Sequence, residues 1–141
     1  MDALRIDLEI VTPERLVVSE TVDEVVLPGS DGSLGVLPGH APLLTGLAAG
    51  ELWYRAGGRT RYLVVSGGFA EVLAHRVSVL AAACERAEEI DVEGAREDRE
   101  RARADLVRPG AGGAEVARAG ERLRHAEARL AVAKRGAGAG P

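Results

Sequence analysis

The chain is poor in cysteine, in aromatic residues and in long apolar runs. Cys84 is the only cysteine among 141 residues, so neither an internal disulfide nor a thiolate cluster for zinc can form. It ends an apolar run, which predicts a small buried hydrophobe. No run approaches the roughly 18 apolar residues of a membrane span, and the N-terminus has no basic stretch followed by an apolar one. We therefore expect an intracellular protein without a signal peptide that reaches a membrane only through a partner.

The patterns typical of catalysis, metal binding and nucleic-acid binding are also missing. The net charge is −4, whereas a nucleic-acid partner requires a basic face. His40, His75 and His125 are too far apart for a His-x-x-x-His metal pair. The glycine-rich stretch 29–35 is not followed by Lys-Ser/Thr, and no Gly-x-Gly-x-x-Gly or Gly-x-Ser-x-Gly is present. The sequence therefore predicts a non-catalytic protein without a metal or a cofactor.

Residues 4 to 82 predict β-strands. Leu4, Ile6, Leu8 and Ile10 alternate with charged residues, a period of two that buries one face of a strand. Turn-forming pairs follow at short intervals, including 57–58, which suits a hairpin, and 67–68. Many short strands at this spacing favour an antiparallel sandwich or flattened barrel. Further strands are expected at 15–19, 22–27, 34–37, 43–47, 51–55, 61–66, 69–73 and 77–81.

Residues 91 to 135 predict two antiparallel helices instead. Asp91 suits an N-cap, and the first helix should run over 92–107, ended by Pro109-Gly110. The second should run over 114–135, followed by a low-complexity tail, 136–141, that we expect to be disordered. Its apolar residues recur every three or four positions and form one narrow stripe. These are Val116, Ala119, Leu123, Ala126, Leu130 and Ala133.

The predicted hairpin offers few large side chains for burial. Its sizeable candidates are Leu106, Val116, Leu123 and Leu130, each worth roughly 1.5–3 kcal/mol when buried. Gly94 inside the first helix costs about 1 kcal/mol relative to alanine. This composition favours a mobile element whose docking site changes at a cost of a few kcal/mol. A rigid surface hairpin is the alternative.

Residues 27–42 combine three prolines and four glycines around a short apolar segment. This predicts two tight turns that flank one strand. Asp31, Ser33 and His40 would then lie on a rigid rim, where contacts with partners commonly occur. A pair of purely structural turns is the alternative.

Three motifs, together with the order of strands and helices, resemble the epsilon subunit of the bacterial F-type ATP synthase. The motifs are VTPER at 11–15, GSLGVLPGHAPL at 32–43 and GGFAEV at 67–72. The resemblance covers roughly residues 4 to 135 and implies an α+β fold. A β-sandwich of about ten strands (1–86) would precede a regulatory helical hairpin (87–135).

The resemblance implies a non-catalytic rotor subunit in the central stalk, on the cytoplasmic face of the bacterial cell membrane. The sandwich would bind the gamma subunit and the ring of c subunits, and would help to couple proton flow to ATP synthesis. Asp31, Gly32, Ser33 and His40 match the family's contact region for the c ring and gamma. Many members carry an acid where this chain has Ser33, which leaves Asp31 as the nearby acid.

The hairpin of this family also extends toward the alpha and beta subunits and hinders ATP hydrolysis. Arg118, Arg122, Arg124 and Arg129 would then meet acidic surfaces of the catalytic subunits. The alternative is that they are solvated partners of nearby glutamates.

Some family members bind ATP through a segment of the form Ile/Leu-Asp-x-x-Arg-Ala. The matching residues here are Ile90, Asp91 and Ala95, but Gly94 replaces the arginine and removes a cation that a phosphate would need. We therefore predict weak or absent ATP binding. The alternative functions are a stand-alone nucleotide-sensing module of the same fold and, disfavoured by the missing catalytic patterns, an enzyme.

Overall fold

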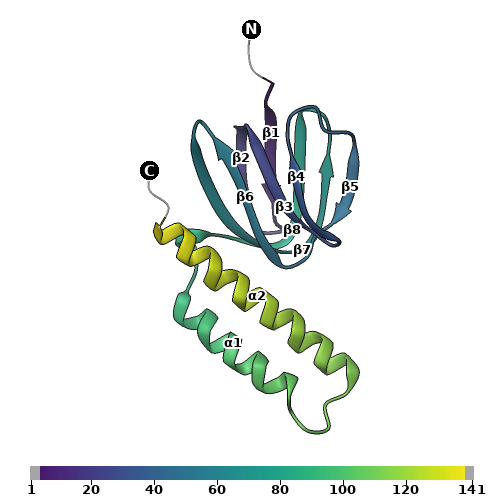
Figure 1. Ribbon diagram of the computed structural model, residues 1–141, viewed down its shortest axis with the longest axis vertical. Coiled ribbons are helices and arrows are strands. Elements are labelled where there is room, and N and C mark those ends of the chain that lie inside the picture. Colours follow the sequence, from purple (N-terminus) through teal and green to yellow (C-terminus); the bar gives the residue numbers. More distant parts are fainter. Residues whose placement is uncertain (1–3, 139–141) are drawn as a thin grey trace.

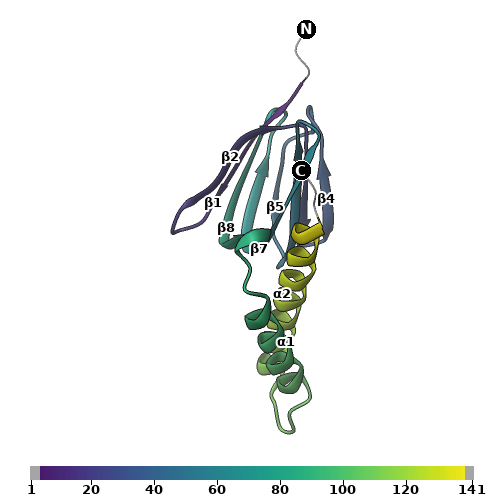
Figure 2. The same ribbon diagram turned by 90° about the vertical axis from the view of Figure 1, so that its left-hand side faces the viewer.

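The computed structural model describes residues 4–138, with eight strands followed by two long helices (Figure 1). The helical hairpin projects from one end of the sandwich, opposite the end where the N-terminus lies (Figure 2). The strands are β1 (Ile6–Val11), β2 (Leu16–Val22), β3 (Glu24–Gly29), β4 (Gly32–Val36), β5 (Leu43–Gly46), β6 (Gly50–Ala56), β7 (Arg59–Val72) and β8 (Arg76–Arg86). The helices are the short 3-10 helix η1 (Ala87–Glu89), then α1 (Val92–Leu106) and α2 (Gly113–Gly138).

The strands form one strongly bent sheet in the order β2-β1-β8-β7-β6-β3-β4, with β5 paired to β7. All neighbours are antiparallel except β1 and β8, which pair in parallel with Leu8 opposite Val77. The expectation of an α+β chain with a β-sandwich and a helical hairpin is confirmed. The one departure from the antiparallel pattern is the β1–β8 pair, in which the last strand lies beside the first.

The structure has eight strands, one fewer than the nine segments expected from the residue pattern, because β7 is a single strand of 14 residues that joins the segments 61–66 and 69–73. The pair Gly67-Gly68, predicted as a turn, lies inside it with φ angles of 66° and 97°. Before this pair β7 bonds to β6, and after it β7 bonds to β5. A Cβ on Gly68 would collide with the carbonyl oxygen of Leu80. The two glycines therefore bend one strand between the two layers instead of ending it.

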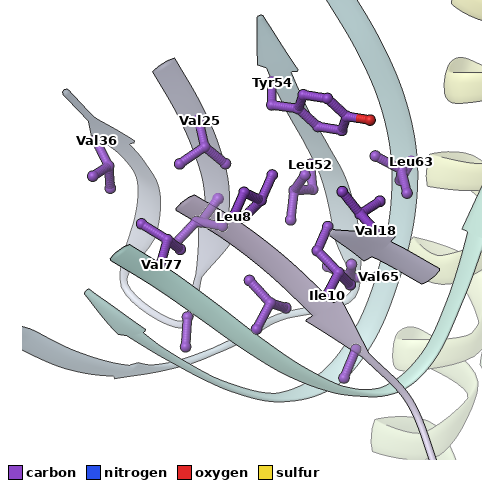
Figure 3. Close-up of a cluster of buried hydrophobic side chains, with 14 of the residues drawn as sticks. Leu8, Ile10, Val18, Val25, Val36, Leu52, Tyr54, Leu63, Val65 and Val77 are labelled. Carbon is purple, nitrogen blue, oxygen red and sulfur yellow. The ribbon is translucent and has the colours of Figure 1, made fainter. Parts of the chain in front are cut away.

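The sandwich core consists of the inward residues of these alternating strands (Figure 3). Leu8, Ile10 and Leu52 are 0–1% exposed, as the period of two predicts. Tyr54 is the one tyrosine in the core, and its hydroxyl donates to Glu20 Oε2 at 3.0 Å. Burial, assisted by the adjacent Glu20, raises the pKa of Tyr54 to about 12.

The two helices lie side by side with α2 against the sandwich (Figures 1 and 2). Asp91 caps α1 as predicted, since its side chain accepts from the Gly94 N–H at 3.1 Å. Alanines spaced seven residues apart are buried to within 1% on both helices, which lets the helices approach closely. These are Ala95 and Ala102 on α1, and Ala119 and Ala126 on α2.

Helix α2 continues beyond its predicted end. It includes Gly136, so the expected disorder from residue 136 is wrong for residues 136–138, and residues 139–141 lie outside those described. Gly136 sits so close to η1 that a Cβ on it would lie 2.5 Å from the Cβ of Ala87. This close packing keeps the helix ordered where its composition alone suggests a tail. Over residues 4–138, no helix is both long and apolar enough to span a membrane.

Candidate functional site

The residues predicted on the rim are divided between two ends of the sandwich. Asp31, Gly32 and Ser33 are exposed at the β3–β4 turn, which Gly32 closes with a φ of 127°. His40 follows β4 at the other end, where its neighbour Gly39 donates to Ala74 O at 2.7 Å. The five residues of β4 separate the two sites by roughly 16 Å. A single small contact cannot use all four residues.

An apolar row crosses the outer face of the sheet. Phe69 on β7 is paired with Leu80 on β8, Leu80 with Val11 on β1, and Val11 with Leu16 on β2. Leu44 on β5 lies on the same face, because it is two residues from Gly46, which is the residue of β5 paired with Phe69. Leu44 is 67% exposed, Leu16 57%, Phe69 48% and Leu80 45%. We call Leu44, Phe69, Leu80, Val11 and Leu16 the apolar row.

The sequence analysis did not identify the apolar row. The available signal was the apolar character of residues that alternate with buried ones, such as Phe69 beside Ala70. Only the strand register shows that these outward residues are neighbours. Large apolar residues that adjoin one another on a surface mark contacts with other proteins.

The docking of α2 on the sandwich depends on one small apolar cluster. Val132 on α2 is fully buried against Val64 of β7 and Ala87 of η1. Val132 is not a member of the predicted stripe, and Leu123 and Leu130 of that stripe are only half-buried. The stripe predicts the contact with α1, whereas the contact with the sandwich lies on another side of the helix.

Charged side chains hold the same junction. Arg129 on α2 binds Glu85 of β8 through two hydrogen bonds of 2.7 and 3.1 Å. Its guanidinium also lies 3.6 Å from Asp98 on α1, and its side chain is 13% exposed. Arg135 pairs with Glu51 at 2.6 Å and lies 5.4 Å from the ring centre of Tyr62.

The four predicted arginines therefore have different surroundings. Arg129 is bound to the sandwich, and Arg122 is bound to Asp105 at 2.7 Å within the hairpin. Arg118 and Arg124 make no ion pair within residues 4–138, and both line a cleft between α2 and the sandwich. The docked hairpin thus presents two of the four arginines to solvent without a carboxylate partner.

The residues predicted for nucleotide binding have structural roles. Asp91 is the α1 cap, and a Cβ on Gly94 would approach its carboxylate to 2.5 Å. Ile90 is half-buried beside the Val132 cluster, and Ala95 is completely buried. Among the residues described, no three histidine, cysteine, aspartate or glutamate side chains gather as metal ligands.

Burial shifts the pKa values of two further groups, the Cys84 thiol and the His125 imidazole. Burial raises the pKa of the Cys84 thiol to about 11. Burial and, after it, the positive charge of Arg129 lower the pKa of His125, although Glu85 and Asp98 act in the opposite direction. His125 is therefore mainly neutral at pH 7.

Comparison with known proteins identifies the family to which the chain belongs. The family described as "ATP synthase, Delta/Epsilon chain, beta-sandwich domain" matches residues 5–87. The ATP synthase epsilon chain of Syntrophobacter fumaroxidans is 50% identical over 133 residues, covering 94% of this chain and 98% of that protein. The chain belongs to the ATP synthase epsilon chain family. Another family member, from Solibacter usitatus, is also 50% identical, over 91% of this chain and 95% of its own length.

Two solved ATP synthase structures contain chains of similar fold. A chain of the Euglena gracilis mitochondrial ATP synthase, in a structure of its OSCP, F1 and c-ring parts, matches with a TM-score of 0.80 and 29% identity. The match covers 92% of this chain and 81% of that one. A chain of the Tetrahymena thermophila central stalk and c-ring has a TM-score of 0.59 at 16% identity, over 91% and 96% of the two chains, which shows a shared fold.

Proposed function

We propose that this chain is a non-catalytic rotor subunit of a proton-translocating F-type ATP synthase. Its sandwich would bind the gamma subunit and the c ring at the cytoplasmic face of the bacterial cell membrane, and would couple c-ring rotation to ATP synthesis. Its C-terminal helices would leave the sandwich and inhibit ATP hydrolysis. The observation that carries the proposal is the full-length similarity to epsilon chains, together with an outer apolar face suited to a permanent partner.

The apolar row is the proposed face for gamma. Phe69, Leu80 and Leu44 are each about half exposed or more and adjoin one another across three strands. Side chains of this size form the centres of stable protein interfaces, where each one buried contributes roughly 1.5–3 kcal/mol. The β3–β4 turn with Asp31 and Ser33, at the other end of β4 from His40, is the proposed contact with the c ring.

The junction between hairpin and sandwich supports a reversible inhibitory role. Val132 is the only fully buried large side chain that α2 places against the sandwich within residues 4–138. Beside the small residues Ala128 and Gly136, the other contacts include the ion pairs of Arg129 and Arg135, whose charges are suited equally to an acidic surface elsewhere. Undocking would free Arg129, so that it joins Arg118 and Arg124 in facing the alpha and beta subunits.

The assembly part of the proposal is tested by co-purification with gamma. A Phe69→Glu/Leu80→Glu variant should lose gamma, because two charges would have to be buried without partners. Val107→Glu is the matched control: Val107 is 80% exposed at the end of the hairpin, away from the row. Equal recovery of gamma with both variants would contradict the assignment of the apolar row.

The inhibitory part is tested separately by ending the chain after Glu88. The shortened chain retains β1 to β8 and should still bring gamma into the complex. ATP hydrolysis by that complex should rise because the inhibitory helices are gone. Unchanged hydrolysis with normal assembly would remove the inhibitory role and leave the assembly role standing.

A further inference from the structure

A cleft of about 840 Å³ opens between the first half of α2 and the loops of the sandwich. On the side of the sandwich, the lining residues are small apart from one leucine: Ser30, Leu47, Ala48, Ala49, Ser66 and Gly67. On the side of the hairpin, the lining residues of α2 include Arg118 and Arg124. This volume lies within the range of small-molecule sites, roughly 300–1,000 Å³. The nucleotide-like segment 90–95 takes no part in the lining.

The charges of the cleft leave two guanidinium groups available. Asp105 holds Arg122 at 2.7 Å, and Glu115 holds Arg108 at 2.6 Å. Arg118 and Arg124 have no such carboxylate in the part of the chain that the structure describes.

Arg124 is also placed by its own helix. Its Nη1 lies 3.6 Å from the point where a Cβ on Gly120 would stand, an ordinary contact distance, so the guanidinium lies along the helix beside Gly120. Glu121 is the one acid of the lining that no ion pair within residues 4–138 neutralises. The available cations in the cleft therefore outnumber the available acids by two to one.

Guanidinium groups bind phosphate through paired hydrogen bonds. Two of them with small polar neighbours suit an anion that carries more than one phosphate. Among the described residues, no phenylalanine, tyrosine or tryptophan lines the cleft to stack on a base, and its one ring is the half-buried imidazole of His125. We propose that this cleft binds a di- or triphosphate chain through Arg118 and Arg124, without recognising a nucleoside.

Such a ligand would bridge two parts of the molecule. Its phosphates would contact α2 through the arginines and the sandwich through Ser30 and Ser66. Binding would therefore stabilise the docked hairpin, by an amount that grows with the logarithm of ligand concentration once the site is mostly filled. The site itself does not depend on assembly with other subunits, so it can be tested on the full chain alone.

The test is calorimetry of the full chain with inorganic tripolyphosphate at low salt. Arg118→Gln/Arg124→Gln should weaken binding by at least about tenfold. The control is Arg96→Gln/Arg103→Gln, which removes the same charge from α1 outside the cleft and should change the Kd by less than about twofold. Circular dichroism checks that both variants are folded. Amide exchange at residues 113–125 should slow when the ligand binds.

Three results would overturn the proposal. The first is the absence of heat with tripolyphosphate at millimolar concentration. The second is equal weakening by the two double variants, which would indicate unspecific attraction to positive charge. The third is ATP binding more than about tenfold tighter than tripolyphosphate, which would show recognition of the nucleoside.

Discussion

Replacing Arg129 by glutamine should loosen the hairpin by a calculable amount. The substitution removes two charge-assisted hydrogen bonds to Glu85 and leaves that carboxylate 31% exposed without its partner. Breaking a fully buried ion pair costs about 3–5 kcal/mol, and an exposed pair contributes about 0–1 kcal/mol. With Arg129 at 13% and Glu85 at 31% exposure, we expect about 1–3 kcal/mol.

Amide hydrogen exchange along α2 measures this loss. Undocking removes packing on the sandwich, and tertiary packing supplies most of the stability of helices in proteins, so the protection of the α2 amides falls as docking weakens. A loss of about 1–3 kcal/mol should accelerate their exchange by about 5- to 150-fold. The variant Arg122→Gln serves as control, because it breaks an exposed pair within the hairpin that we expect to contribute less than about 0.5 kcal/mol.

A double-mutant cycle with Glu85→Gln isolates the pair itself. Glu85→Gln should remove most of the additional effect of Arg129→Gln, because the two side chains share one interaction. An acceleration below about twofold for Arg129→Gln, or additive effects in the cycle, would refute the argument that this pair holds the hairpin.

Three further predictions concern single residues. Gly136→Ala should lower the free energy of unfolding in urea by about 1–2 kcal/mol, because the new Cβ would collide with Ala87. This effect should outweigh the preference of about 1 kcal/mol that alanine has over glycine in a helix, and a more stable variant would contradict it. The pKa of His125 is lowered in the folded chain. The contribution of His125 to the free energy of unfolding is therefore complete above the pKa of the unfolded state, about 6.5, and is lost as pH falls through the pKa of the folded state. Urea midpoints at pH 7.5 and 5.5 should therefore differ more for the native chain than for His125→Gln. Cys84 is 8% exposed with a pKa of about 11, so a thiol reagent should label it at pH 8 far more slowly in the native chain than in urea, and equal rates would count against its burial.

The alternation of residues predicted most strands because it reports burial on one face directly. It failed at Gly67-Gly68, where the local signal for a turn and for a bend within a strand is the same. What distinguishes them is that β8 pairs along both sides of the bend, with Ser66 opposite Ala83 and Gly68 opposite Ala81. That information depends on residues distant in the sequence, so no local pattern contains it.

The candidate surfaces show the same limit. The stripe of α2 was visible because a single partner, α1, imposes one period on it. Val132 and Arg129 contact the sandwich instead, and a helix with two partners has two overlapping periods. The predicted rim residues are divided for a simpler reason. Asp31 and His40 are close in sequence, but the extended strand β4 lies between them.

The two surfaces of the molecule differ in the kind of interaction that they offer, and this difference favours a fixed base with a movable arm. The apolar row gains from burial and loses nearly all of that gain if it is exposed again, so a partner on it would remain bound through a rotation cycle. The hairpin is held by Arg129 and Arg135 on the carboxylates of Glu85 and Glu51, and by a small apolar contact in which Val132 is the one large side chain of α2. An arginine that leaves one carboxylate for another exchanges interactions of similar strength, so the free-energy difference between two docking sites stays small. Differential contacts of a few kcal/mol, from a neighbouring subunit or an anion in the cleft, are then sufficient to shift the hairpin almost completely.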